Sequence, residues 1–277
     1  MSGEHVRGRP DRLSVAAQRR LRAVSTRLGI RGALGRSALP VLAGYGRGLR
    51  VRVGASNIRV ASPGEPVLER TVLDLLSPGD VFYDLGANIG WYSLLAARKV
   101  GPEGCVVAFE PLLRNAFYAQ RNANTNRLHN ITVIPAAVSD RDGWLSFFMA
   151  GSLMGRLDKD DFEGQARHRA KQDRSGGRHA LVPVVALDSW LAQTGQRPPR
   201  IVKIDVEGAE VGVLKGMRET IAAVRPILIV ELHGTRERLA DELEAIGYEH
   251  RLIESDLPTR EGGEYGLHVL AKPMPVA

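Results

Sequence analysis

Residues 81–90 read VFYDLGANIG, and this stretch decides the fold. The apolar and aromatic run at its start predicts a buried strand over residues 81–85. Gly86 and Gly90 permit a tight turn, after which a helix is expected over residues 91–99. A strand that passes through a glycine turn into a helix is typical of an open parallel sheet, where ligands bind at the carboxyl ends of the strands.

The rest of the chain alternates short β-branched runs with amphipathic stretches in the same way. This alternation predicts a parallel sheet with helices on both faces, so we expect one doubly wound α/β domain over residues 49–277. In its entry segment, residues 49–60, apolar and polar residues alternate as in a hairpin, and Pro66 favours a helix over residues 66–76. Further strands are expected over 105–109, 131–138, 144–149, 181–187, 201–205 and 227–232, near 251 and over 267–271, and further helices over 112–126, 209–224 and 236–246.

The composition bounds the class of protein. The 277 residues are 44% hydrophobic and 25% charged, which supports a good core and excludes collagen-like and fully disordered chains. Cys105 is the single cysteine, so an internal disulfide and a multi-cysteine zinc site are also excluded. No run approaches the about 18 apolar residues of a membrane span. We therefore expect a soluble, cytoplasmic protein without a transmembrane segment.

The net positive charge of the chain comes from its N-terminal residues. Residues 1–36 hold nine arginines against Glu4 and Asp11, a local balance of +7, and the remaining residues sum to zero. Residues 1–48 are therefore expected to form a basic arm, partly helical or disordered, that packs on the domain or frays in solvent. Peripheral contact with anionic lipid and a lid over a large substrate are alternatives, and a transit peptide has a similar composition.

A polar segment over residues 150–180 mixes seven basic with five acidic residues. A segment of this length without a secondary-structure pattern is uncommon inside a compact domain and is usually a lid or disordered. We expect a mobile cover over the substrate site.

Acidic residues flank the glycine turn. A dinucleotide site needs G-x-G-x-x-G, whereas Gly86 and Gly90 give G-x-x-x-G with Asp84 before it. A carboxylate at position 84 would repel a pyrophosphate but suits a cofactor that carries an ammonium group. Glu110, at the end of the next strand, can accept hydrogen bonds from both hydroxyls of an adenosyl ribose. Together these residues indicate a site for S-adenosylmethionine, with Asn88 beside the amino-acid end of the cofactor.

The positions of other residues in the predicted strands and helices suggest what these residues do. Val138 ends the strand over residues 131–138, where an adenine could stack or receive backbone hydrogen bonds. Asn115 and Asn122 lie on the helix over residues 112–126, and we expect them on its surface. The tryptophans are assigned mainly to packing, because such residues usually anchor a core; they are Trp91, Trp144 and Trp190.

Five stretches carry a resemblance: VFYDLGANIG at 81–90, FEP at 109–111, AVSD at 137–140, KIDVEGAE at 203–210 and VELH at 230–233. Together they resemble the FkbM family of S-adenosylmethionine-dependent methyltransferases, and KIDVEGAE is the most specific of them. The resemblance covers about residues 80–235. It implies a class I methyltransferase fold, with a Rossmann-like, mostly parallel seven-stranded sheet, and O-methylation of a hydroxyl on a sugar, polyketide or glycolipid.

Methyl transfer to an alcohol needs a base, or a metal that acidifies the hydroxyl. The candidates stand at the ends of the strands over 201–205 and 227–232, which face the same crevice as the cofactor. His233 is suited to proton removal near pH 7, and Glu231 lies two residues before it on the same face, so we expect both to be catalytic. Asp205 is the third catalytic candidate. It follows an apolar strand and shares one face of that strand with Lys203, and an acid at such a position is hard to explain by a structural role.

The same three residues, Asp205, Glu231 and His233, could instead ligate a divalent ion. Carboxylate-rich ligands favour magnesium, calcium or manganese over zinc, but a sequence does not fix the ligand count, so the metal stays open. Glu207 and Glu210 fall at the start of a helix, where acids are stabilised by the helix dipole. A structural role as helix-start acids and a functional role in the site therefore both stay open for these two residues.

Two other functional classes compete with an O-methyltransferase. A nucleic-acid methyltransferase is supported only by the basic arm; the Asn/Asp-Pro-Pro-aromatic turn of amino-methylating enzymes is replaced here by residues 206–208, VEG, and Cys105 lies inside a strand. A non-catalytic cofactor-binding protein would bind the cofactor without turnover. We therefore expect a small-molecule or glycolipid acceptor and no nucleic-acid partner, while the oligomeric state is left open.

Overall fold

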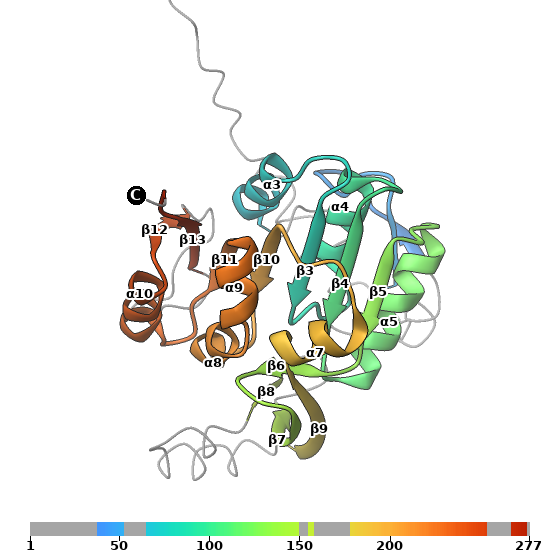
Figure 1. Cartoon of the computed structure of the whole chain (residues 1–277). Coiled ribbons are helices and arrows are strands. Elements are labelled where there is room, and N and C mark those ends of the chain that lie inside the picture. The colour runs from blue at the N-terminus through green and yellow to red at the C-terminus, as the bar shows by residue number, and fades with distance from the viewer. Residues whose placement is uncertain (1–37, 53–64, 150–154, 158–177, 254–266, 276–277) are drawn as a thin grey trace, which may run out of the picture. The chain divides into compact units, whose positions relative to one another are not determined.

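The computed structural model describes residues 38–52, 65–149, 155–157, 178–253 and 267–275 (Figure 1). The chain divides into two compact units, Met1–Gly64 and Glu65–Ala277. In the first unit, strands β1 (Ala38–Pro40) and β2 (Arg50–Arg52) pair antiparallel. The strand expected at the start of the entry segment therefore pairs with residues upstream of it. The basic arm as far as residue 37 and the entry segment from residue 53 lie outside the described residues.

Seven strands of the second unit form one sheet: β3 (Val81–Leu85), β4 (Cys105–Phe109), β5 (Ile131–Ile134), β10 (Ile201–Ile204), β11 (Ile227–Glu231), β12 (Tyr248–Ile253) and β13 (His268–Pro273). Their order is β12-β13-β11-β10-β3-β4-β5 (Figure 1). The pairs from β11 to β5 are parallel, whereas β13 is antiparallel to both of its neighbours. This sheet confirms the predicted class I methyltransferase fold.

Helices cover this sheet: α3 (Pro66–Leu75), α4 (Trp91–Val100), α5 (Leu113–Thr125), α7 (Leu187–Thr194), α8 (Glu210–Lys215), α9 (Arg218–Val224) and α10 (Arg236–Ala245). Neighbouring side chains of a strand point to opposite faces. Tyr83 contacts Trp190 of α7 edge to face, whereas Asp84 accepts a hydrogen bond from Ser93 of α4. Helices therefore lie on both faces, as predicted. No helix in the described ranges combines the length and apolar composition needed to cross a membrane.

A second sheet contains β6 (Ala137–Ser139), β7 (Gly143–Met149), β8 (Gly155–Leu157) and β9 (Arg178–Ala186), in the order β6-β9-β7-β8. It includes the strands expected over 144–149 and 181–187, but the prediction of one strand over 131–138 is wrong. Pro135 has no N–H to donate, so β5 ends at Ile134 and β6 pairs in parallel with β9. Residues 150–154 and 158–177 of the expected lid lie outside the described residues.

The prediction of one helix over residues 209–224 is also wrong, because the chain bends between α8 and α9. A Cβ atom on Gly216 would lie 1.9 Å from the carbonyl oxygen of Ser139, so the backbone of β6 is too close for a larger residue there. Asp188 of α7 accepts hydrogen bonds from the backbone N–H groups of Glu219 and Thr220, both at 2.8 Å. The first turn of α9 is therefore capped by a side chain from another helix.

The tryptophans divide between packing and exposure. Trp91 and Trp190 are buried, as predicted. Trp144 is 68% exposed, so its assignment to packing is wrong. Side chains alternate along β7, and because Phe147 faces the core, Trp144 lies on the opposite face of the strand.

Candidate functional site

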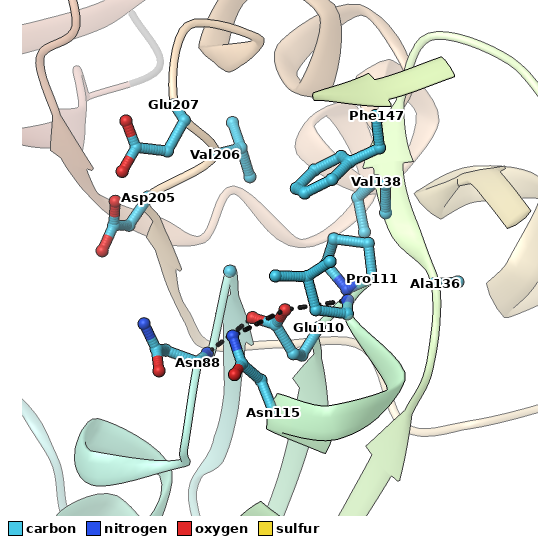
Figure 2. A pocket seen from close by; sticks show the side chains of 13 residues that line it. Asn88, Glu110, Pro111, Asn115, Ala136, Val138, Phe147, Asp205, Val206 and Glu207 are labelled. Atoms are coloured by element: carbon cyan, nitrogen blue, oxygen red, sulfur yellow. Dashed lines mark hydrogen bonds between the residues drawn. The ribbon is translucent and has the colours of Figure 1, made fainter. Parts of the chain in front are cut away.

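A cleft with about 600 Å³ of empty space, part of it open to solvent, lies at the carboxyl ends of β3, β4 and β10 (Figure 2). The cleft lies at the sheet edge where the sequence predicts the cofactor. The predicted site residues that line it are Gly86, Asn88, Glu110, Val138 and Asp205.

The glycine turn is shaped by close backbone contacts. Gly86 has a φ of +84°, and a Cβ atom there would lie 1.8 Å from the carbonyl oxygen of Asp205, so no other residue fits. The N–H groups of Gly86 and Ala87 both donate to the carbonyl of Phe109 at 2.9 Å. Gly90 does not line the cleft. Its φ is positive, and a Cβ atom there would lie 3.1 Å from the Cβ of Ala119, so glycine at this position lets α4 pack closely on α5.

Glu110 follows β4 and is buried. Its Oε2 accepts a hydrogen bond from the N–H of Asn88 at 2.8 Å, and its Oε1 accepts from the N–H of Leu112 at 2.9 Å. Burial raises the pKa of Glu110 to about 7, although the hydrogen bonds from Leu112, Asn88 and Asn115 lower it. The carboxylate is therefore fixed in the cleft, where two hydroxyl donors of a ligand could reach it.

The expectation that Asn115 and Asn122 lie on the helix surface is wrong, because both are buried. The side-chain amide of Asn115 donates to Glu110 Oε1 at 3.3 Å and lines the cleft. The amide of Asn122 donates to the carbonyl of Ile89 at 2.9 Å and ties α5 to the glycine turn. Each asparagine thus satisfies a buried polar partner: Asn115 bonds the nearby Glu110, whereas Asn122 bonds Ile89, which lies far away in the sequence.

Asp84 lies beneath the turn, outside the residues that line the cleft. It is 1% exposed, and its Oδ2 accepts a hydrogen bond from Ser93 Oγ at 2.6 Å. Lys203 Nζ lies 3.9 Å from Asp84 Oδ1 and donates to Asp205 Oδ2 at 3.0 Å. Burial raises the pKa of Asp84, and the carboxylates of Asp205 and Asp84 raise that of Lys203 against the effect of its own burial. Lys203 therefore links Asp84 to the cleft through Asp205.

The two ends of the cleft differ in polarity (Figure 2). Val138, Phe147 and Pro111 lie at one end, while the carboxylates of Asp205 and Glu207 lie at the other. Phe147 comes from the second sheet and was not predicted as a site residue. An apolar end suits a planar aromatic ring such as adenine, and an acidic end suits a positively charged group.

The predicted catalytic residues come together beside the acidic end. His233 Nε2 lies 3.6 Å from Glu231 Oε1 and 3.9 Å from Asp205 Oδ1. Glu207 Oε2 lies 3.6 Å from the same nitrogen and belongs to the cleft lining. The ends of β10 and β11 thus gather three carboxylates around one imidazole nitrogen.

Glu210 fixes the ring of His233 from the other side. Its Oε1 lies 2.9 Å from His233 Nδ1, and its carboxylate also accepts hydrogen bonds from Gly208 N and Thr235 Oγ1. Glu210 is fully buried as the first residue of α8, so it holds the histidine in addition to starting a helix. Burial alone would lower the pKa of His233, but the hydrogen bond to Glu210 and the nearby carboxylates raise it to about 9.

His268 is a further member of this cluster and was not predicted from the sequence. It begins β13 and stands opposite Glu231 in the antiparallel pairing of β11 and β13, with Nε2 3.4 Å from Glu231 Oε2. It is buried. Its place near the start of the last predicted strand was the one hint in the sequence that it could belong to the site. The antiparallel register that brings it to Glu231 cannot be predicted from local sequence.

Two residues that line the cleft have unusual backbone conformations. Asn88 has a φ of 53° and Glu207 a φ of 55°. Asparagine tolerates the left-handed region, whereas a residue such as glutamate is destabilised there by roughly 1–2 kcal/mol. Such strain concentrates at functional sites, and here it directs the Glu207 carboxylate toward His233.

Comparisons with known proteins agree with this geometry. Residues 84–254 match the sequence profile of the methyltransferase FkbM domain. The hexuronic acid methyltransferase AglP of Haloferax volcanii is 30% identical over 173 residues, 61% of this chain and 63% of that protein. The 2-O-methyltransferase NoeI of Sinorhizobium fredii is 28% identical over 182 residues, 64% of this chain and 73% of that protein.

A solved structure also aligns with this fold. The crystal structure of methyltransferase FkbM from Methylobacillus flagellatus has a TM-score of 0.49 and 19% identity, over 71% of this chain and 44% of that one. The match to AglP spans less than two thirds of that relative's length. The profile match, however, extends over more than half of the 277 residues and includes the glycine turn together with Asp205, Glu231 and His233. The chain therefore belongs to the FkbM methyltransferase family.

Proposed function

We propose that this chain is an S-adenosylmethionine-dependent O-methyltransferase that acts on a hydroxyl of a sugar, polyketide or glycolipid acceptor. The observation that carries the proposal is the adjacency of two sites. A cleft built around Gly86 and Glu110 meets, at Asp205, a cluster of carboxylates around His233. The first site suits the methyl donor, and the second suits removal of a hydroxyl proton.

The residues of the cleft fit the donor in polarity. Glu110 presents a fixed carboxylate for two ribose hydroxyls, and Val138 and Phe147 offer an apolar wall for adenine. The acidic end, at Asp205, suits a positive charge. When bound, the cofactor supplies an electrophilic methyl group. Asp84 and Lys203 act as positioning residues in this proposal, because they contact Asp205 or its partner behind the cleft.

The acid–histidine cluster handles the acceptor's proton in this proposal. An alcohol is a weak nucleophile until its proton leaves, and a positioned base is typically worth about 10²- to 10⁴-fold. Asp205, Glu231 and His233 form this group, with Glu210 holding the imidazole ring in place. Because the pKa of His233 is raised to about 9, the imidazole is charged near pH 7 and a carboxylate, of Asp205 or Glu231, accepts the proton. The cluster must hold the oxygen about 3 Å from the methyl carbon and in line with the breaking bond.

The acceptor class is supported by what the relatives are named for. AglP is named as a hexuronic acid methyltransferase and NoeI as a 2-O-methyltransferase. Both names describe small hydroxylated acceptors or an oxygen target. We extend this class to the present chain because its cluster contains acids and a histidine, which suit proton removal from a hydroxyl.

Labelled methyl transfer tests the proposal. The full chain is incubated with S-adenosylmethionine carrying a deuterated methyl group, together with a small-molecule and lipid extract of the producing cells and, separately, with RNA. We expect the label on a hydroxyl oxygen of a small molecule or glycolipid. In His233→Gln we expect turnover to fall by about 100-fold or more while S-adenosylhomocysteine still binds. Label only on RNA, or cofactor binding without any labelled product, would refute the proposal.

A further inference from the structure

We propose that Asp205, Glu231 and His233 bind one divalent cation of the Mg²⁺ and Mn²⁺ class at the acidic end of the cleft. Each side chain offers one ligand atom, and these atoms lie within 4.8 Å of one another. Carboxylate-rich ligand sets suit Mg²⁺ and Mn²⁺, whereas zinc sites are built mainly from cysteine and histidine. Two carboxylates and one imidazole therefore point to the harder cations.

The orientation of His233 is the first argument for the site. Its Nε2 faces carboxylate oxygens of Glu207, Glu231 and Asp205 at 3.6, 3.6 and 3.9 Å. These distances exceed the usual length of an N–H···O hydrogen bond, and a small inward movement of the ligands would close them on a cation. Metal-binding histidines usually donate their other ring N–H to a carboxylate, the position that Glu210 occupies at 2.9 Å.

His268 gives a second, independent argument. Its side chain is 4% exposed, and its Nε2 makes no hydrogen bond to the described residues. This nitrogen is aimed at the cluster and lies 3.4 Å from Glu231 Oε2, while Glu231 Oε1 faces His233. A buried polar nitrogen without a hydrogen bond is costly. A cation on Oε1 would fix the carboxylate so that His268 can donate to Oε2.

The charge of the cluster is the third argument. Four carboxylates lie within 3.9 Å of the His233 ring nitrogens. Lys203 is the lysine beside them, and it is shared between Asp205 and the buried Asp84. Like charges repel strongly in a partly buried site, because the effective dielectric constant is lower than in water. A divalent cation would offset this excess of negative charge.

The position of the site connects it to the cleft. Asp205 lines the cleft and is also a ligand in this proposal, so the cation would lie beside the acidic end of the cleft. A cation there would lower the pKa of an acceptor hydroxyl, a consequence that rests on the proposed function. Binding of the cation itself does not depend on methyl transfer and can be measured without the cofactor.

Titration of the full chain with MnCl₂ tests the site directly. Calorimetry and the electron paramagnetic resonance signal of free Mn²⁺ should show one ion bound per chain, displaced by Mg²⁺. Glu231→Gln and His233→Gln should each weaken the affinity about 10- to 100-fold or more. Glu249→Gln, an exposed residue of β12, is the matched control and should leave the affinity unchanged.

Two further measurements separate the outcomes. Each variant is melted and titrated with S-adenosylhomocysteine, and Asp205→Asn replaces any variant that fails to fold. Absence of saturable binding up to millimolar Mn²⁺, unchanged Mn²⁺ affinity in the variants, or displacement by Zn²⁺ but not by Mg²⁺ overturns the cation assignment. S-adenosylhomocysteine binding without Mn²⁺ binding overturns this inference alone. Mn²⁺ binding without S-adenosylhomocysteine binding supports the cation site and contradicts the proposed function.

Discussion

At the scale of single residues, Glu110 couples pH to the cofactor site. Burial raises the pKa of its carboxyl to about 7, so the charged form that accepts ribose hydroxyls develops as the pH rises through this value. We expect the affinity for S-adenosylhomocysteine, measured by calorimetry, to strengthen between about pH 6 and about pH 8. Because the pKa is higher in the folded than in the unfolded chain, the same ionisation lowers the unfolding free energy of the unliganded protein as the pH rises.

The control for this prediction is Glu110→Gln, which has no ionisable group at this position. The variant should bind S-adenosylhomocysteine more weakly and lose the part of the pH dependence centred near 7. A wild-type affinity that does not change over this interval, or a variant that keeps the full dependence, would assign the pH effect to another group.

Gly86 and Gly79 offer a matched comparison of two glycines with nearly equal φ, +84° and +86°. A Cβ atom on Gly79 meets nothing within 4 Å, so Gly79→Ala should cost only the backbone strain, about 1 kcal/mol. In Gly86→Ala the Cβ would meet the carbonyl oxygen of Asp205, so we expect a loss of about 3 kcal/mol or more. Urea denaturation of both variants measures the difference, and equal losses would contradict the close approach.

Residues with a local signal were predictable from the sequence, and residues with a distant partner were not. Gly86, Asn88 and Glu110 follow strands in a recognisable pattern, and all line the cleft. His268 and Phe147 enter the site through pairing with distant strands, β11 and β9. Register between such strands depends on packing of the whole sheet, which no local window of sequence contains.

At the scale of elements, Asp188 connects α7 to α9, two helices that are separated in the sequence by β10 and α8. Its carboxylate accepts hydrogen bonds from the backbone N–H groups of Glu219 and Thr220 and from the Thr220 hydroxyl. Asp188→Ala should destabilise the protein by about 1–2 kcal/mol, because the first turn of α9 loses its cap. The melting temperature should fall by about 2–4 °C for each kcal/mol.

Asp241→Ala, at an exposed position of α10, is the control for this loss and should leave the melting temperature nearly unchanged. If the two variants melted at the same temperature, the cap on α9 would contribute nothing measurable to stability.

Most elements around the main sheet were predicted, whereas α7, β1 and β8 were not. Two errors in element boundaries have local physical causes. The sequence pattern identified all seven strands of the main sheet, and the signal was clearest for the parallel strands, because buried parallel strands are short and apolar. It did not separate β5 from β6, since Pro135 lies inside an otherwise continuous strand pattern. It also joined α8 to α9 across Gly216, whose backbone packs too closely on Ser139 for any larger residue.

At the scale of the whole molecule, the cleft and the acid–histidine cluster lie within the unit Glu65–Ala277. We expect a fragment of residues 65–277 to unfold cooperatively and to bind S-adenosylhomocysteine with an affinity within about threefold of the full chain, because it holds the complete main sheet. Calorimetry on both proteins makes the comparison. A folded fragment that has lost binding would show that residues 1–64 contribute to the site.

Calorimetric titration of the full chain with S-adenosylmethionine tests the central claim most directly. The account predicts one molecule bound per chain, with affinity at least about tenfold weaker in Glu110→Ala, where hydrogen bonds to a charged group are lost. Glu103→Ala, at an exposed position before β4, should bind as the wild type does. Absence of binding by the wild-type chain, or equal affinity in Glu110→Ala, would contradict the assignment of this cleft to the methyl donor.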